Sequence, residues 1–116
     1  MAGLELKARV WIEKDGKPVI GKGGAEILRA IEKHSSLSRA ARELGMSYRF
    51  AWMYINRMES ASGLKVVRRE RGGREGGRMV LTDEGRELLE IYERAEKAAK
   101  EALRKVSENL KSNKIK

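Results

Sequence analysis

Arg49 and Asn56 are the residues of this sequence best suited to recognise the edges of DNA bases. They are about two helical turns apart, so on a helix their side chains would lie on the same face. An arginine can form two parallel hydrogen bonds with guanine, and an asparagine can do the same with adenine. Ser47 and Tyr48, just before Arg49, could bond phosphate groups with the help of the helix N-terminus. These residue types predict a DNA-binding surface over residues 47–60.

The residues around this surface have the spacing of a helix-turn-helix. A short helix is expected over residues 38–44, where two adjacent alanines would let a second helix approach closely. Gly45 suits the turn, because glycine adopts the left-handed conformation without strain. Ser47 is the expected cap of the next helix. The residues of this motif that we expect to contact DNA are Ser38, Arg39, Ser47, Tyr48, Arg49, Trp52, Met53 and Asn56.

Some of these residues also have a purely structural interpretation. A serine before a helix most often only caps it, and for Trp52 a half-buried or core position is favoured slightly over a contact. For Arg49 a DNA contact is favoured, because its surroundings are basic. A plain packing corner between two helices is the alternative for the whole motif. This alternative is disfavoured because the small residues, the turn residue and the apolar residues all lie at the positions that a helix-turn-helix requires.

A basic, glycine-rich segment follows at residues 65–78, with six basic residues against two acidic ones. Its two glycine pairs stand between short apolar segments, which predicts a hairpin with a flexible, cationic tip. Such a wing can lie along phosphates and reach into a minor groove, where arginine is favoured. A nucleotide-binding loop is disfavoured because the segment lacks the Gly-Lys-Ser/Thr ending of a Walker loop. The other alternative, a disordered and solvated loop, describes the protein without DNA and is compatible with a wing that becomes ordered on DNA. The expected contacts are Arg71, Arg74 and Arg78.

The rest of the chain supplies the elements that must position these residues. Residues 4–13 alternate between apolar and polar types, which predicts a half-buried strand. An Asp-Gly turn at 15–16 would return the chain as a second strand over 17–20. Residues 21–24 are expected to form a flexible joint before a helix over 25–34. The prediction is an α+β winged helix-turn-helix in a single domain over 1–116, with a hairpin at 1–20, the motif and wing at 21–82 and a long helix at 83–110.

The long C-terminal helix carries more apolar surface than one small domain needs. Thr82 is its expected cap, and acidic residues in its first turn suit the helix dipole. Its first apolar residues, such as Leu88 and Tyr92, can pack on the domain itself. The later ones are spaced like a coiled-coil seam, so we expect a homodimer, with the helix from Ala25 as a second contributor. The predicted dimerisation residues are Ala99, Leu103, Val106 and Leu110.

Composition narrows the function classes. The 116 residues carry a formal net charge of +9, which favours an anionic partner, either nucleic acid or a membrane surface. The chain has no cysteine and one histidine, so thiolate or histidine-rich metal sites are excluded, and no cofactor or metal is expected. Neither a triad nor paired carboxylates in an apolar setting are visible, so an enzyme is not expected.

Nothing in the sequence predicts a membrane protein. Glu5, Lys7 and Arg9 exclude a signal peptide at the N-terminus, and no apolar run approaches the roughly 18 residues that would cross a bilayer. The last helix could lie on a membrane surface, but its apolar face lacks bulky aromatic residues. We therefore expect a cytoplasmic protein.

Together these residues resemble the DNA-binding domain of ModE-type, molybdate-responsive regulators, and more distantly that of the LysR type. The resemblance covers roughly residues 21–92 and implies a winged helix, a homodimer and an operator with two-fold symmetry. Full-length ModE proteins bind molybdate through further C-terminal domains, which this sequence does not reach, so no molybdate binding is expected of it and the effector stays open. The matching positions are Ser47-Tyr48-Arg49, Ala51-Trp52, Asn56, Met58-Glu59, Gly63, Val66-Val67, Arg69, the wing 72–77, Leu81-Thr82 and Gly85.

The expected function is sequence-specific binding of double-stranded DNA by a dimeric transcriptional regulator. The helix 47–60 of each copy would enter successive major grooves about one helical turn apart, and the wing 68–78 would bind phosphates. The alternative is a non-specific, chromatin-like architectural protein, which the charge of +9 suits equally. The polar surface at Arg49 and Asn56 argues against it.

Overall fold

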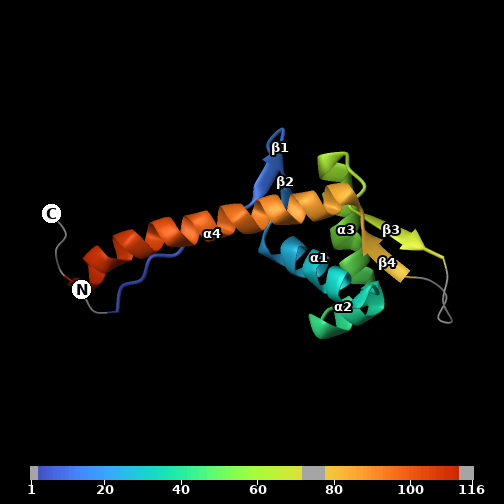
Figure 1. Ribbon diagram of the computed structural model, residues 1–116, viewed down its shortest axis with the longest axis horizontal. Coiled ribbons are helices and arrows are strands. Elements are labelled where there is room, and N and C mark those ends of the chain that lie inside the picture. Colours follow the sequence, from blue (N-terminus) through green and yellow to red (C-terminus); the bar gives the residue numbers. More distant parts are fainter. Residues whose placement is uncertain (1–2, 72–77, 113–116) are drawn as a thin grey trace.

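The computed structural model describes residues 3–71 and 78–112 and confirms the α+β class predicted from the sequence. A long helix, α4, runs across a group of shorter elements and extends well beyond them (Figure 1). The structure extends 61 × 31 × 21 Å along its principal axes. In chain order the elements are β1 (Ile12–Lys14), β2 (Lys17–Ile20), α1 (Lys22–His34), α2 (Leu37–Glu43), α3 (Tyr48–Ser62), β3 (Val67–Glu70), β4 (Arg78–Leu81) and α4 (Asp83–Ser112).

The predicted N-terminal hairpin is present but shorter than expected. Strands β1 and β2 are antiparallel, and Asp15 and Gly16 turn between them with φ of 52° and 78°. The prediction of a strand from residue 4 is wrong: residues 4–11 lie outside any strand and are exposed apart from Val10. The reason is the length of the partner, because β2 leads at once into α1 and leaves no strand for residues 4–11 to pair with. This N-terminal segment instead runs beside the C-terminal half of α4 (Figure 1).

The prediction of a flexible joint at residues 21–24 is also wrong, because α1 begins at Lys22. Its glycines allow close packing. A Cβ atom on Gly24 would lie 2.9 Å from Cε of Met58 and 3.1 Å from Cγ1 of Ile20. Glycine therefore lets the first turn of α1 lie directly against α3 and β2.

The helix-turn-helix has the caps that its geometry requires. Ser36 caps α2, and its Oγ accepts a hydrogen bond from the backbone N–H of Arg39 at 3.1 Å. Gly45 has a φ of 69°, as expected for the turn. Ser47 caps α3 as predicted, because its Oγ accepts from the N–H of Phe50 at 3.0 Å. Two caps of this kind are typically worth about 1 kcal/mol each.

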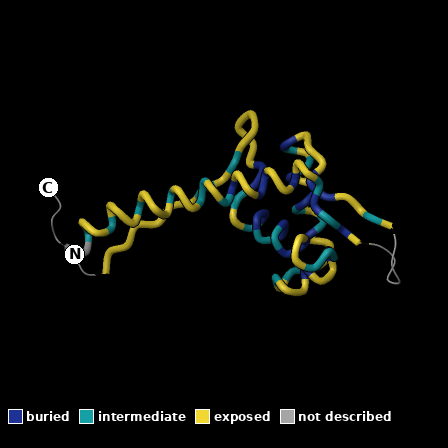
Figure 2. Tube along the Cα trace, in the orientation of Figure 1, coloured by how far each residue is buried: buried dark blue, intermediate teal, exposed yellow. Residues whose placement is uncertain are grey.

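One apolar core holds these elements together. The apolar stripe of α3, formed by Ala51, Ile55 and Met58, is buried, and it packs with apolar residues of every other helix and of strands β2, β3 and β4. Figure 2 shows the buried residues gathered in this part of the molecule, while none of residues 98–110 of α4 is buried. The fully buried large side chains are Tyr92, Ile20, Ile27, Leu28, Ile31, Ile55, Met58 and Val66.

A carboxylate ties α2 to the end of α1. The Glu43 Oε1 lies 2.8 Å from Nζ of Lys33 and 3.2 Å from Nε2 of His34. The hydrogen bond from Lys33, and after it the His34 imidazole beside the carboxylate, hold the pKa of Glu43 below its ordinary value. The contact ties the C-terminal end of α2, next to the turn of the motif, to the C-terminal end of α1.

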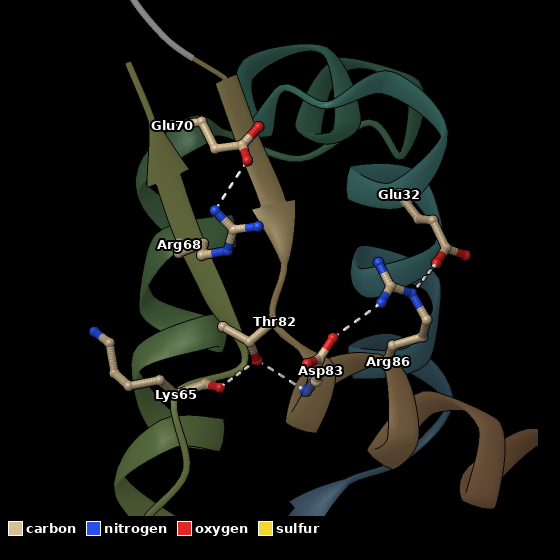
Figure 3. A network of polar contacts seen from close by, with 8 residues as sticks. Glu32, Lys65, Arg68, Glu70, Thr82, Asp83 and Arg86 are labelled. Atoms are coloured by element: carbon tan, nitrogen blue, oxygen red, sulfur yellow. Dashed lines mark hydrogen bonds and ion pairs between the residues drawn. The ribbon is translucent and has the colours of Figure 1, made fainter.

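Thr82 joins the second wing strand to α4, as Figure 3 shows. Its Oγ1 accepts a hydrogen bond from the N–H of Gly85 at 3.0 Å, which confirms the predicted cap, and donates to the carbonyl of Lys65. The backbone N–H of Thr82 donates to the carbonyl of Val66 at 3.0 Å. These bonds hold the N-terminus of α4 against residues 65 and 66, which lead into β3.

Glu59 fixes the same stretch of chain from the other side. Its side chain is 14% exposed, and Oε2 accepts hydrogen bonds from the N–H groups of Val66 at 2.8 Å and Val67 at 3.5 Å. A half-buried carboxylate thus faces two backbone donors at the start of the wing. Hydrogen bonds to charged groups are stronger than those between neutral groups.

We expect Glu59→Gln to lower the free energy of unfolding by about 1 kcal/mol, because the amide keeps one acceptor oxygen but loses the charge. Urea denaturation followed by circular dichroism would measure it as a lower midpoint with an unchanged slope. Glu87→Gln, on the exposed side of α4, is the matched control and should change little. Equal midpoints for the two variants would contradict a stabilising role for the Glu59 carboxylate.

Candidate nucleic-acid interface

The outward face of α3 carries the residues predicted to read bases. Arg49, Met53 and Asn56 are exposed and recur at spacings of three and four, on the side of α3 opposite its buried stripe. Met53 is 42% exposed, so an apolar side chain lies between the two polar ones. Arg57 is exposed on the same face and was missed from the sequence, although its spacing from Met53 was enough to find it.

A cluster on the flank of α3 connects it to the wing. The Tyr48 hydroxyl oxygen accepts hydrogen bonds from Nε1 of Trp52 at 3.0 Å and from Nη2 of Arg69 at 3.1 Å. The Arg69 guanidinium also lies over the Trp52 ring, 5.4 Å from its centre. Trp52 is half-buried, as favoured from the sequence. Arg69 was not among the predicted contacts, since no linear spacing relates a strand residue to a helix residue that packs against it.

The wing itself is an antiparallel pair. Val67 lies opposite Leu81, and Glu70 lies opposite Arg78. Strand β4 is attached to the turn between α1 and α2, because the N–H of Met79 donates to the carbonyl of Ser35 at 3.0 Å. Arg78 donates from Nη2 to the Oγ of the same serine at 3.2 Å.

The predicted wing contacts lie at the far end of this pair. Arg71 and Arg78 are exposed, each next to the tip. Arg74 and the glycine pairs lie outside the described residues. Arg68, on the other side of β3 from Arg69, is paired with Glu70 at 2.9 Å (Figure 3).

The first turn of α2 supplies the remaining predicted contacts. Ser38 and Arg39 are exposed there. Because Ser36 is the cap, the hydroxyl of Ser38 does not serve that role. The exposed predicted residues thus come from α2, α3 and the wing, the three parts that a helix-turn-helix brings to one duplex.

Within residues 3–71 and 78–112, no group of three or more acidic, histidine or cysteine side chains could hold a metal ion. In the same ranges, no helix combines the length and the apolar character needed to cross a membrane.

Helices α1, α2 and α3 pack together, α3 presents one face outward, and β3 and β4 form a wing beside it. This arrangement defines a winged helix-turn-helix domain. The family model described as "Bacterial regulatory helix-turn-helix protein, lysR family" matches residues 24–86. The chain therefore belongs to the lysR family of bacterial regulatory helix-turn-helix proteins.

Among curated proteins, the chain is 34% identical over 110 residues to the molybdenum transport protein ModE of Azotobacter vinelandii, which covers 95% of the chain and 41% of that protein. It is 39% identical over 67 residues to the DNA-binding transcriptional dual regulator ModE of Escherichia coli K12, covering 58% of the chain and 26% of that protein. The chain thus spans less than half of the length of these relatives. Among solved structures, ArgP from Mycobacterium tuberculosis matches 72% of the chain and 29% of its own, with a TM-score of 0.54 and 23% identity, which supports the fold alone.

These similarities confirm the resemblance to ModE-type and LysR-type domains that the residues of the motif and wing predicted. They also confirm that the chain is regulatory rather than enzymatic, because the family it belongs to is one of regulatory helix-turn-helix proteins.

Proposed function

We propose that this chain binds double-stranded DNA sequence-specifically as part of a transcriptional regulator. The observation that carries the proposal is the face of α3, where Arg49, Met53 and Asn56 are exposed while the opposite face is held in the core. Such a face can enter a major groove, and the exposed arginines of the wing can follow the phosphates beside it. Its similarity to the E. coli transcriptional regulator ModE supports this reading.

Selection of bound sites from a pool of random duplexes, followed by sequencing, tests the proposal. We expect an enriched inverted repeat with half-sites about one helical turn apart. Binding without enrichment would instead support the alternative, a non-specific architectural protein. The control is a parallel selection at higher salt, where phosphate contacts weaken and sequence preference should become sharper.

We propose further that two copies pair through α4. The helix is 30 residues long, but no residue between 93 and 110 is buried. In the predicted seam, Ala99, Leu103 and Leu110 are half-buried, and the N-terminal segment lines one groove with the first two. Val106 is 53% exposed. A helix that projects this far from its own core gains stability from a partner rather than from its own propensity.

A second apolar face of α4, exposed except at the half-buried Ala95, is rotated from the predicted seam and shares Val106 with it. It consists of Ile91, Ala95, Ala98, Ala102 and Val106, at spacings of four, three, four and four. Ile91 is 47% exposed. Small residues in the middle of the face would allow two helices to approach closely. The interface that we propose therefore combines this face with the predicted seam.

We expect Val106→Glu to change the mass of the protein in solution from that of a dimer to that of a monomer, because the interface would bury an unpaired carboxylate. Light scattering coupled to gel filtration measures the mass. Lys97→Glu places the same side chain on the opposite side of α4 and should leave the dimer intact. A monomeric wild-type protein at micromolar concentration would rule out the pairing.

The expectation that this chain does not bind molybdate stays a prediction. The names of two relatives, the molybdenum transport protein ModE and the molybdenum-pterin-binding protein MopA of Rhodobacter capsulatus, refer to molybdenum. The match covers 41% and 37% of those proteins, and the expectation from the sequence is that the matched part does not bind molybdate itself. Equal DNA affinity of this chain with and without molybdate would support that expectation, and a change in affinity would contradict it.

A further inference from the structure

The hydroxyl of Tyr48 has a fixed orientation. A phenolic oxygen can accept two hydrogen bonds and donate one. Both acceptor positions are occupied, by Nε1 of Trp52 at 3.0 Å and Nη2 of Arg69 at 3.1 Å. The indole and guanidinium groups can only donate, so the Tyr48 proton cannot be shared with either of them. It must point away from both, and Tyr48 is 44% exposed.

The two donors come from different elements. Trp52 is one turn further along α3, whereas Arg69 lies on β3 of the wing, where it also stacks over the Trp52 ring. The Tyr48 oxygen is therefore the point at which the wing strand is tied to the first turn of α3. A cation beside the oxygen also makes its proton a better donor, because bonds in a chain polarise one another.

Building on the function proposed above, we propose that Tyr48 donates its hydroxyl proton to a phosphate oxygen of the DNA backbone. Arg69 and Trp52 act as positioning residues, which aim that proton and hold the wing at a set distance from α3. Tyr48 begins α3, where backbone N–H groups add to the attraction for an anion. A phosphate contact fixes the register of α3 on the duplex, so this cluster sets which base pairs Arg49 and Asn56 can reach.

The network itself can be tested in the free protein. The chain has two tryptophans, so its NMR spectrum contains two indole N–H resonances. Tyr48→Phe and Arg69→Lys should each shift the Trp52 resonance and leave that of Trp11 in place. Tyr54→Phe is the matched control, because that tyrosine lies on the same helix but against Gly23 of α1. An unshifted Trp52 resonance in Tyr48→Phe would overturn the network, whatever the protein binds.

The phosphate contact is tested with duplexes that carry a single neutral methylphosphonate linkage at successive positions. We expect Tyr48→Phe to bind unmodified DNA about tenfold more weakly, on selected and random duplexes alike. At one position in each half-site, the neutral linkage should weaken binding of the wild-type protein but not binding of Tyr48→Phe. If Tyr48→Phe keeps the wild-type profile, Tyr48 makes no phosphate contact. If the wild-type protein binds no duplex, the proposed function and the phosphate contact both fail, while the indole resonances still report on the network.

Discussion

Gly85→Ala should destabilise the protein by about 3 kcal/mol or more and lower its melting temperature by roughly 10 °C or more. A Cβ atom at Gly85 would lie 2.1 Å from the carbonyl oxygen of Val66, far inside the 3.4–4 Å of ordinary contact. The obstacle is backbone, so no side chain can rotate to make room. That carbonyl also accepts the hydrogen bond from Thr82, and the Gly85 N–H donates to the Thr82 hydroxyl. Moving any part of this junction breaks bonds at the start of α4.

The matched control is Gly23→Ala, another glycine inside a helix. There the new Cβ would meet the hydroxyl end of Tyr54, a side chain that can move aside. Alanine favours a helix over glycine by about 1 kcal/mol, so this variant should be close to neutral or slightly stabilised. Thermal unfolding followed by circular dichroism compares the two. A Gly85→Ala protein as stable as Gly23→Ala would show that α4 does not press on Val66 as closely as described.

Local sequence signals predicted the motif well because its geometry depends on neighbouring residues. The cap at Ser47, the left-handed Gly45 and the buried stripe of α3 each follow from residue type and spacing within one or two turns. The same holds for the cap at Thr82. The strand expected from residue 4 failed for the opposite reason. Alternation shows that a segment could be a strand, but only the rest of the fold decides whether a partner strand exists.

The errors around the site also come from tertiary contacts. The glycines at residues 21–24 indicated flexibility, whereas Gly24 lies within α1 and is needed for the close packing of α1 on Met58 and Ile20. Arg69 was passed over in favour of the arginines nearer the tip, because its role depends on Trp52 and Tyr48, which lie on a different element. Nothing in the sequence indicated that Ser35 would bind both Arg78 and the backbone of Met79. Contacts between distant positions are what one sequence does not reveal.

Arg49→Ala should weaken binding to the selected operator by about 1–3 kcal/mol and leave binding to random duplexes nearly unchanged. Arg49 is exposed in the first turn of α3, on the outward face with Met53 and Asn56. A bidentate bond from its guanidinium to guanine exists only at the right base pair, so its loss removes specificity rather than general affinity. Competition binding of both duplexes at one salt concentration measures the two losses together.

Arg71→Ala is the control, because a wing arginine that contacts phosphate should weaken both duplexes alike and reduce the salt dependence of binding by about one phosphate contact. Equal losses of affinity on both duplexes for Arg49→Ala would show that Arg49, like Arg71, contacts DNA phosphate rather than a base. Base recognition would then fall to Asn56, Met53 and Arg57, further along the same face. Since side chains near the start of such a helix reach deepest into the groove, that result would mean that α3 enters it at a different angle from the one proposed.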